Sequence, residues 1–194
     1  ELYRNDSQTV IDAFDRIVVH IFMQKEKKQH KFFVICGCNP GAGTTSTAVE
    51  LAISLAVAGW KTVLVDADLR KENQYKRLNQ KVKAGLSDYI VDKELGTSIC
   101  CATNWPGLDY IACGRNRDET PVKMLCSVRM GELMEELRQK YDFVIFDVPS
   151  LNSAVDAKIL ASKADCTFLV VESGVTTFKN LSSAKKQMDE AGAN

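Results

Sequence analysis

The residues best suited to chemistry form a glycine-rich turn between a buried apolar run and a helical stretch. From Val34 to Thr47 the sequence reads VICGCNPGAGTTST. Gly41 and Gly43 can take positive φ, which turns successive backbone N–H groups inward, and the start of the following helix adds positive potential. The Thr45 hydroxyl is placed for the magnesium ion of a nucleotide. We therefore expect a phosphate cradle made by Pro40, Gly41, Ala42, Gly43, Thr44, Thr45 and Ser46.

The turn departs at two positions from the phosphate-loop pattern G-x-x-x-x-G-K-[ST]. Cys38 replaces the first glycine, and Thr44 replaces the lysine that reaches the β- and γ-phosphates. The second change removes a cation, so weak nucleotide binding is expected. The alternative interpretation is a glycine-rich strand-to-helix turn that binds no ligand.

Three carboxylates follow two other apolar runs. Asp66 and Asp68 come at the end of the run that begins at Val63, and Asp147 ends the run that begins at Phe143. Ligands of parallel sheets bind beyond the carboxyl ends of the strands, so these side chains are expected to converge on the turn. Carboxylates beside a phosphate cradle indicate a divalent cation between them. Taken singly, each Asp is better explained as a cap of the loop or helix that follows it, and only the combination favours a nucleotide site.

The succession of apolar patterns predicts an α/β fold with a doubly wound, mostly parallel sheet and helices on both faces. Short β-branched runs alternate with stretches of helical period, and each run is apolar on both sides of the pleat, as for strands covered by helices on both sides. The expected strands are Phe32 to Cys36, Thr62 to Asp66, Leu108 to Cys113, Phe143 to Asp147 and Cys166 to Val171. The expected helices are Thr45 to Ala58, Lys123 to Lys140, Ala154 to Ala161 and Thr177 to Ala191.

The N-terminal region is expected to lie outside this sheet. Apolar residues recur at helical spacing from Asn5 to Gln24, and a charged linker follows from Lys25 to Lys31. We therefore expect residues 1–31 to form a helix and linker packed on the core, and residues 32–194 to form the phosphate-binding domain. Asn194 directly follows a helical stretch, where a fold of this kind continues with another strand. The natural protein is therefore expected either to continue or to lack its last strand.

The composition is that of an ordinary globular protein. Of the 194 residues 45% are hydrophobic, and 25 Lys or Arg balance 25 Asp or Glu, so nothing global favours nucleic acid or an anionic membrane. The longest apolar runs are strand-sized, and the polar first residues do not resemble a signal peptide. Seven cysteines leave one over from any full pairing, which favours reduced thiols and a cytoplasmic location.

Some cysteines and basic residues raise the question of other chemistry. The segments Cys36-Gly37-Cys38 and Cys100-Cys101 lack the spacer and the second half of a zinc site. Cys38 is expected to be oxidisable only if it is exposed. Arg70 and Lys71 follow the acidic residues at the rim of the expected site. They are expected either to contact phosphate or a protein substrate, or simply to face solvent.

At these motifs the chain resembles the bacterial tyrosine kinases of capsular and exopolysaccharide biosynthesis, which belong to the MinD and ParA class of P-loop proteins. The turn from Pro40 to Gly43 resembles the P-G-E-G turn of that family. Asp66 to Arg70 resembles its second acidic motif, and Tyr141 to Pro149 resembles its Walker B strand. Connecting segments such as Gly85 to Asp88 and Glu135 to Arg138 are similar as well, so the resemblance covers nearly the whole chain.

The resemblance implies a protein-tyrosine kinase that transfers a phosphoryl group from Mg·ATP. In that role Thr45, Asp66 and Asp147 would hold the metal. Asp66 and Asp68 would assist the metal or the attacking hydroxyl, while the loop and Arg70 would contact ATP or ADP. Because the loop lysine is replaced, weak or absent activity is expected, and the alternative is an inactive pseudokinase that keeps the fold as a scaffold.

The resemblance also implies a partner, a membrane-anchored regulator of polysaccharide chain length that recruits the chain to the membrane. Two features of the family are missing. Its ring-forming helix motif E-x-x-R-x-x-R falls on Asp12, Asp15 and Val18, so both arginines are absent, and there is no C-terminal tyrosine cluster, the autophosphorylation target. Without these cations the charged ring contact cannot form in its usual way, and a monomer or small homo-oligomer is expected.

Overall fold

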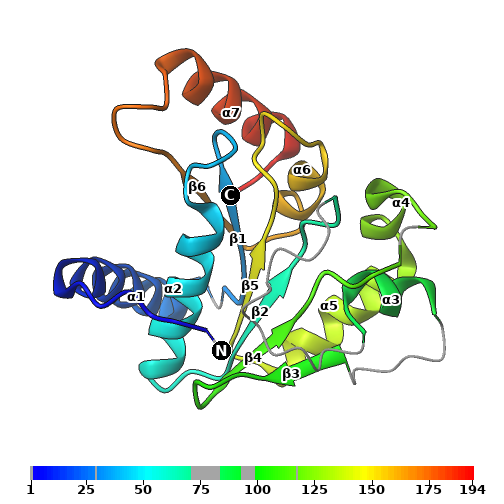
Figure 1. The fold of residues 1–194 in the computed structure, drawn as a ribbon, viewed down its shortest axis with the longest axis horizontal. Coiled ribbons are helices and arrows are strands. Elements are labelled where there is room, and N and C mark those ends of the chain that lie inside the picture. Colours follow the sequence, from blue (N-terminus) through cyan, green and yellow to red (C-terminus); the bar gives the residue numbers. More distant parts are fainter. Residues whose placement is uncertain (1, 29, 71–83, 93–98, 117) are drawn as a thin grey trace.

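A single six-stranded sheet forms the centre of the molecule. The computed structural model describes residues 2–28, 30–70, 84–92, 99–116 and 118–194. The strand order is β3-β4-β2-β5-β1-β6, and every pairing is parallel except that of β3 with β4 (Figure 1). The strands are β1 (Phe32–Gly37), β2 (Thr62–Asp66), β3 (Cys100–Ala102), β4 (Leu108–Ile111), β5 (Phe143–Asp147) and β6 (Cys166–Val170).

Helices cover both faces of the sheet. Helices α1 (Gln8–Lys28) and α2 (Thr44–Val57) contribute to a buried cluster on one face. The other face is covered by α3 (Leu86–Val91), α4 (Pro121–Leu125), α5 (Val128–Lys140), α6 (Asp156–Ala161) and α7 (Phe178–Ala191). The doubly wound, mostly parallel α/β fold predicted from the sequence is therefore confirmed.

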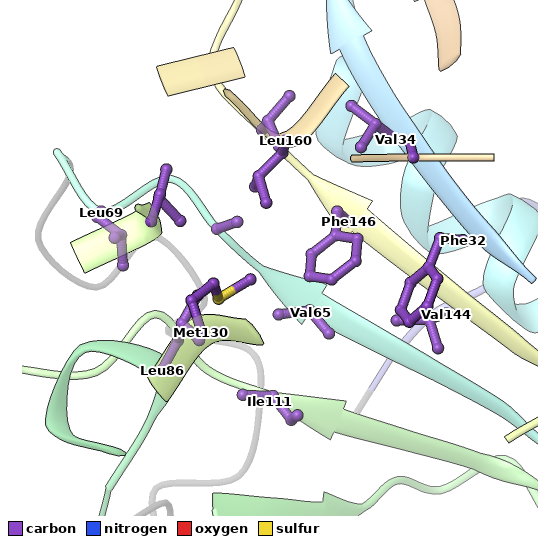
Figure 2. Close-up of a cluster of buried hydrophobic side chains, with 14 of the residues drawn as sticks. Phe32, Val34, Val65, Leu69, Leu86, Ile111, Met130, Val144, Phe146 and Leu160 are labelled. Carbon is purple, nitrogen blue, oxygen red and sulfur yellow. The ribbon is translucent and has the colours of Figure 1, made fainter. Parts of the chain in front are cut away.

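Strand side chains divide between two hydrophobic clusters according to the alternation of the pleat. In β1, Phe32 and Val34 join the cluster beneath α5 and α6, whereas Phe33 and Ile35 join the cluster beneath α2. Figure 2 shows the first cluster, where Phe146 of β5 lies among side chains of neighbouring strands and helices. Burial on both sides explains why these runs are continuously apolar rather than alternating.

The helix expected from Lys123 to Lys140 is in fact two helices, which corrects that prediction. The chain leaves the helical path at Cys126 and Ser127, between α4 and α5. The Ser127 hydroxyl accepts a hydrogen bond from the Met130 backbone N–H at 3.1 Å, which caps the start of α5. Apolar periodicity continues across the break and hides it, so the capping serine was the only local signal.

Two short elements, α3 and β3, were not predicted. Each has six residues or fewer, too short for a periodic pattern to stand out. Strand β6 is also less covered than expected: all five of its residues are half-buried rather than buried. The cause is its position at the edge of the sheet.

The N-terminal helix packs on α2, but its limits differ from the expected ones. Helix α1 begins at Gln8 and continues to Lys28, into the segment predicted as a linker. Val18 and Ile21 bury its inner face, and the Phe22 ring lies 6.0 Å from the Trp60 ring. Among the described residues, no helix is both long enough and apolar enough to span a membrane. The division of the chain at residue 31 stays a prediction.

Candidate nucleotide-binding site

The glycine-rich turn leaves the carboxyl end of β1, which lies between β5 and β6 inside the sheet. Gly41 and Gly43 both have φ of +84°, as expected of residues that turn backbone N–H groups inward. Gly43 is the N-cap of α2, whose first residue is Thr44. The turn therefore places the positive end of a 14-residue helix beside the loop.

Thr44 fills space at the base of the loop. A Cβ atom added at Gly37 would lie 2.4 Å from the Thr44 hydroxyl oxygen and 3.0 Å from the Asn39 carbonyl oxygen. Gly37 is therefore needed for this close approach, although its φ is ordinary. This role of Gly37 was not predicted, and its position at the end of a fully buried strand was the available signal.

Thr45 and Asp147 are in direct contact at the carboxyl edge of the sheet. The Thr45 hydroxyl donates a hydrogen bond of 2.6 Å to Oδ2 of Asp147. Asp66 is the register partner of Asp147 on adjacent parallel strands, so their side chains leave the same side of the sheet. Only 5% of Asp66 and 3% of Asp147 are exposed. The structure therefore brings together the three residues expected to hold a metal ion.

Asp66 lies in an environment that disfavours its charge. Burial, and next the negative charge of Asp147, raise the pKa of Asp66 to about 7. Two donors act in the opposite direction: the Asp68 backbone N–H at 3.2 Å and the Tyr110 hydroxyl at 3.4 Å. A divalent cation placed here would relieve the repulsion between the two carboxylates.

Asp68, the third carboxylate, does not join Asp66 and Asp147 in a metal site made of protein ligands alone. Asp68 is half-buried just beyond the end of β2. Among the described residues, no group of three or more His, Cys, Asp and Glu side chains is arranged to hold a metal ion. The oxygen donors that are present, Thr45, Asp66 and Asp147, fit magnesium, which commonly takes one or two carboxylates and completes its shell with phosphate and water.

Arg70 pairs with another side chain of the same chain, whereas the sequence led us to expect contact with phosphate or a protein substrate, or exposure to solvent. Its guanidinium makes a two-point contact with the carboxylate of Asp156, the first residue of α6, with Nη2 2.9 Å from Oδ1. The Asp156 side chain is 1% exposed, whereas that of Arg70 is 47% exposed. Arg70 thus ties the segment after β2 to α6, and its contact with phosphate stays a prediction. Lys71 lies outside the described residues.

Cys38 is buried within the loop, so its expected condition for oxidation is not met. Burial raises the pKa of the Cys38 thiol. Burial, and next the proximity of Cys38, raise the pKa of the Cys36 thiol to about 12. Both side chains are therefore protonated at neutral pH and act as small apolar groups.

Asn152, in the segment after β5, is a site residue that was not predicted from the sequence. Its Nδ2 donates to Asn39 Oδ1 at 3.3 Å and to the Asn180 carbonyl oxygen at 3.3 Å. Its Oδ1 accepts from Ser183 and Gln187 of α7 at 3.1 and 2.9 Å. Asn152 therefore links the phosphate loop to α7. No periodicity or motif marks such a residue, since its role arises only where distant segments meet.

The fold of this chain is shared with proteins of known class. The family model described as an AAA domain matches residues 30–190. The cell division ATPase MinD of Pyrococcus furiosus has the same fold, with a TM-score of 0.69 at 19% identity over 84% of this chain and 68% of that one. The matched AAA-domain family and this shared fold show that the chain is an α/β P-loop protein.

Closer relatives define the family. The chain is 32% identical to the tyrosine-protein kinase CpsD of Streptococcus agalactiae over 174 residues, 88% of this chain and 75% of that protein. It is 34% identical to the tyrosine-protein kinase YwqD of Bacillus subtilis over 177 residues, 91% and 74% respectively. The kinase domain of the Escherichia coli tyrosine kinase ETK superposes with a TM-score of 0.87 at 26% identity, covering 95% and 72%. The chain belongs to the bacterial tyrosine kinase family, as its motifs indicated.

Proposed function

We propose that this chain binds Mg·ATP through the loop from Pro40 to Ser46 and acts as a weak protein-tyrosine kinase in capsular or exopolysaccharide biosynthesis. The observation that carries the proposal is the 2.6 Å contact of Thr45 with Asp147, beside a loop whose glycines both have positive φ. The residues proposed to hold magnesium are thus present and in contact, while Thr44 stands at the position of the loop lysine.

The roles of the residues follow from their positions. Backbone N–H groups from Gly41 to Thr45 would bind phosphate oxygens, helped by the positive end of α2. Thr45 and Asp147 would hold magnesium directly or through water, with Asp66 beside them. When bound there, magnesium would supply positive charge that offsets the charge of the phosphates during phosphoryl transfer. Asp66 or Asp68 would orient the attacking tyrosine hydroxyl and accept its proton.

A second candidate is a non-catalytic module, and Thr44 is the observation that favours it. Without the lysine, no side chain in the loop supplies a cation to the β- and γ-phosphates. Three of the described tyrosines are also poor targets for modification, because Tyr89, Tyr110 and Tyr141 are at most 2% exposed, whereas Tyr3 is 65% exposed. Such a pseudokinase would keep the fold to engage a membrane-anchored regulator of chain length.

Transfer of labelled phosphate from Mg·ATP to a tyrosine-containing acceptor separates the two candidates. For the kinase, we expect a slow signal that Asp66→Ala abolishes and that the exposed-site control Asp189→Ala leaves unchanged. Binding of the regulator without nucleotide, together with no transfer above the Asp66→Ala background, would instead establish the module.

A further inference from the structure

Residues 2–5 belong to no helix or strand and lie against α2 and the turn between β3 and β4. Leu2 is 4% exposed, Tyr3 is 65% exposed, and the Arg4 side chain is 16% exposed. This alternation is that of an extended peptide with two side chains turned inward and one outward. None of these residues takes part in the nucleotide-binding site.

The main chain of this segment is recognised by side chains from the β3–β4 turn. Asn104 binds both polar groups of Leu2: its Oδ1 accepts from the Leu2 N–H at 2.6 Å, and its Nδ2 donates to the Leu2 carbonyl oxygen at 3.0 Å. The Trp105 indole N–H donates to the same carbonyl at 2.8 Å. A side-chain amide that pairs with one residue's N–H and C=O reproduces the hydrogen bonds of a strand pairing.

The arginine is recognised by a buried carboxylate on α2. Glu50 is 6% exposed, and its Oε1 accepts from Arg4 Nε at 3.1 Å while its Oε2 accepts from the Asn5 backbone N–H at 2.9 Å. Arg4 Nη2 also donates to Ser54 Oγ at 3.1 Å. A carboxylate buried to this degree requires charged and hydrogen-bonding partners, and the segment supplies both.

We propose that Glu50, Asn104 and Trp105 form a peptide-binding site for an extended segment in which an apolar residue stands two positions before an arginine. Leu2 to Asn5 occupies this site within the same chain, and a separate peptide of the same pattern competes for it. Attachment gives the resident segment an effective concentration of about millimolar, so a free peptide binds measurably only when the resident contacts are weakened. Glu50 lies five residues after Thr45 on α2, so the occupant of the site contacts the helix that begins at the phosphate loop.

Fluorescence anisotropy of a labelled peptide with the sequence of residues 1–7 tests this proposal. The proteins are the native chain and the Leu2→Ala/Arg4→Ala variant, in which the resident segment has lost both inward side chains. We expect the peptide to bind the variant at least about tenfold more tightly than the native chain. Adding Glu50→Gln or Asn104→Ala to the variant should weaken binding at least about tenfold. Adding Glu135→Gln, an exposed carboxylate on α5, should not.

The proposal would be overturned if the peptide failed to bind a Leu2→Ala/Arg4→Ala variant whose unfolding temperature equals that of the native chain. It would also be overturned if adding Glu50→Gln left the affinity of that variant for the peptide unchanged. Hydrogen exchange covers the case in which the double variant does not fold. In the full-length chain, Asn104→Ala alone should speed amide exchange of Leu2 to Asn5 at least about tenfold. Unchanged exchange would equally overturn it. Neither measurement involves nucleotide, so the result is independent of the proposed kinase function.

Discussion

At the scale of single residues, Thr44 is the substitution expected to set how tightly this loop binds nucleotide. The backbone donors, the positive end of α2 and the Thr45–Asp147 contact remain, and the missing group is one charged donor. A lost charge-assisted contact costs roughly 1.5–3 kcal/mol, or about 10- to 150-fold in affinity. Binding should therefore be weakened rather than abolished.

Thr44→Lys should strengthen ATP binding by about 10- to 150-fold and raise any phosphoryl transfer by about 10²- to 10³-fold, because it restores a cation at the phosphates. Steady-state kinase assays and titration of the variant measure both effects. Val57→Lys, which adds the same charge at an exposed position at the far end of α2, is the control and should change neither. Native turnover of about 1 s⁻¹ or more would show that another cation already fills the role.

Asp66→Asn should stabilise the protein in a pH-dependent manner. In the folded chain the pKa of Asp66 is about 7, against an ordinary value of 3.8. As pH rises from about 4 to 7 the unfolded state loses this proton and the folded state keeps it, so the free energy of unfolding falls over that window. At about 1.4 kcal/mol per pKa unit, the substitution should add about 2 to 4 kcal/mol at pH 8 and little at pH 4.

Chemical denaturation at the two pH values measures this difference. The exposed-site variant Asp189→Asn is the control and should show no such dependence. A stabilisation by Asp66→Asn that is equal at pH 4 and pH 8 would contradict the argument, since it would not arise from ionisation of the carboxyl group.

At the scale of elements, the position of a residue could be predicted from the sequence where it is set by the strand or turn that carries it. The end of β1, the positive-φ glycines and the carboxylates that end β2 and β5 lie where the sequence predicts, because strand ends meet at one edge of a parallel sheet. The Ser127 break, the Arg70–Asp156 pair and Asn152 were not predicted. The Arg70–Asp156 pair and the contacts of Asn152 depend on which segments meet in space, which neither periodicity nor spacing encodes, whereas the break was marked locally only by its capping serine.

Asn152→Ala should loosen the phosphate loop, because it removes the contacts that join Asn39 to the α7 residues Ser183 and Gln187. Removing hydrogen bonds of about 1 kcal/mol each that hold the loop should raise the Kd for Mg·ATP about fivefold or more. Thermal unfolding should change little, since Asn152 is exposed. Ser162→Ala, on an exposed serine that follows α6, is the control, and an unchanged Kd for Asn152→Ala would contradict the proposed linkage.

At the scale of the whole molecule, the face that builds rings in the family differs in this chain. Val18, at the place of one interface arginine, is 8% exposed and faces the core, and Asp15 lies 3.4 Å from Arg4 of the same chain. We therefore predict a monomer or small oligomer in solution. Light scattering of the purified chain checks this, and a stable octamer would contradict it.

The central claim is that this loop still binds magnesium nucleotide despite the loss of its lysine, and calorimetric titration of the native chain with Mg·ATP tests it most directly. We predict weak but measurable heat at millimolar nucleotide that disappears without magnesium and in Asp147→Asn, because Asp147 and its contact Thr45 are the residues proposed to hold the metal. No heat and no thermal shift at millimolar Mg·ATP would contradict the claim and leave the non-catalytic module as the function of this fold.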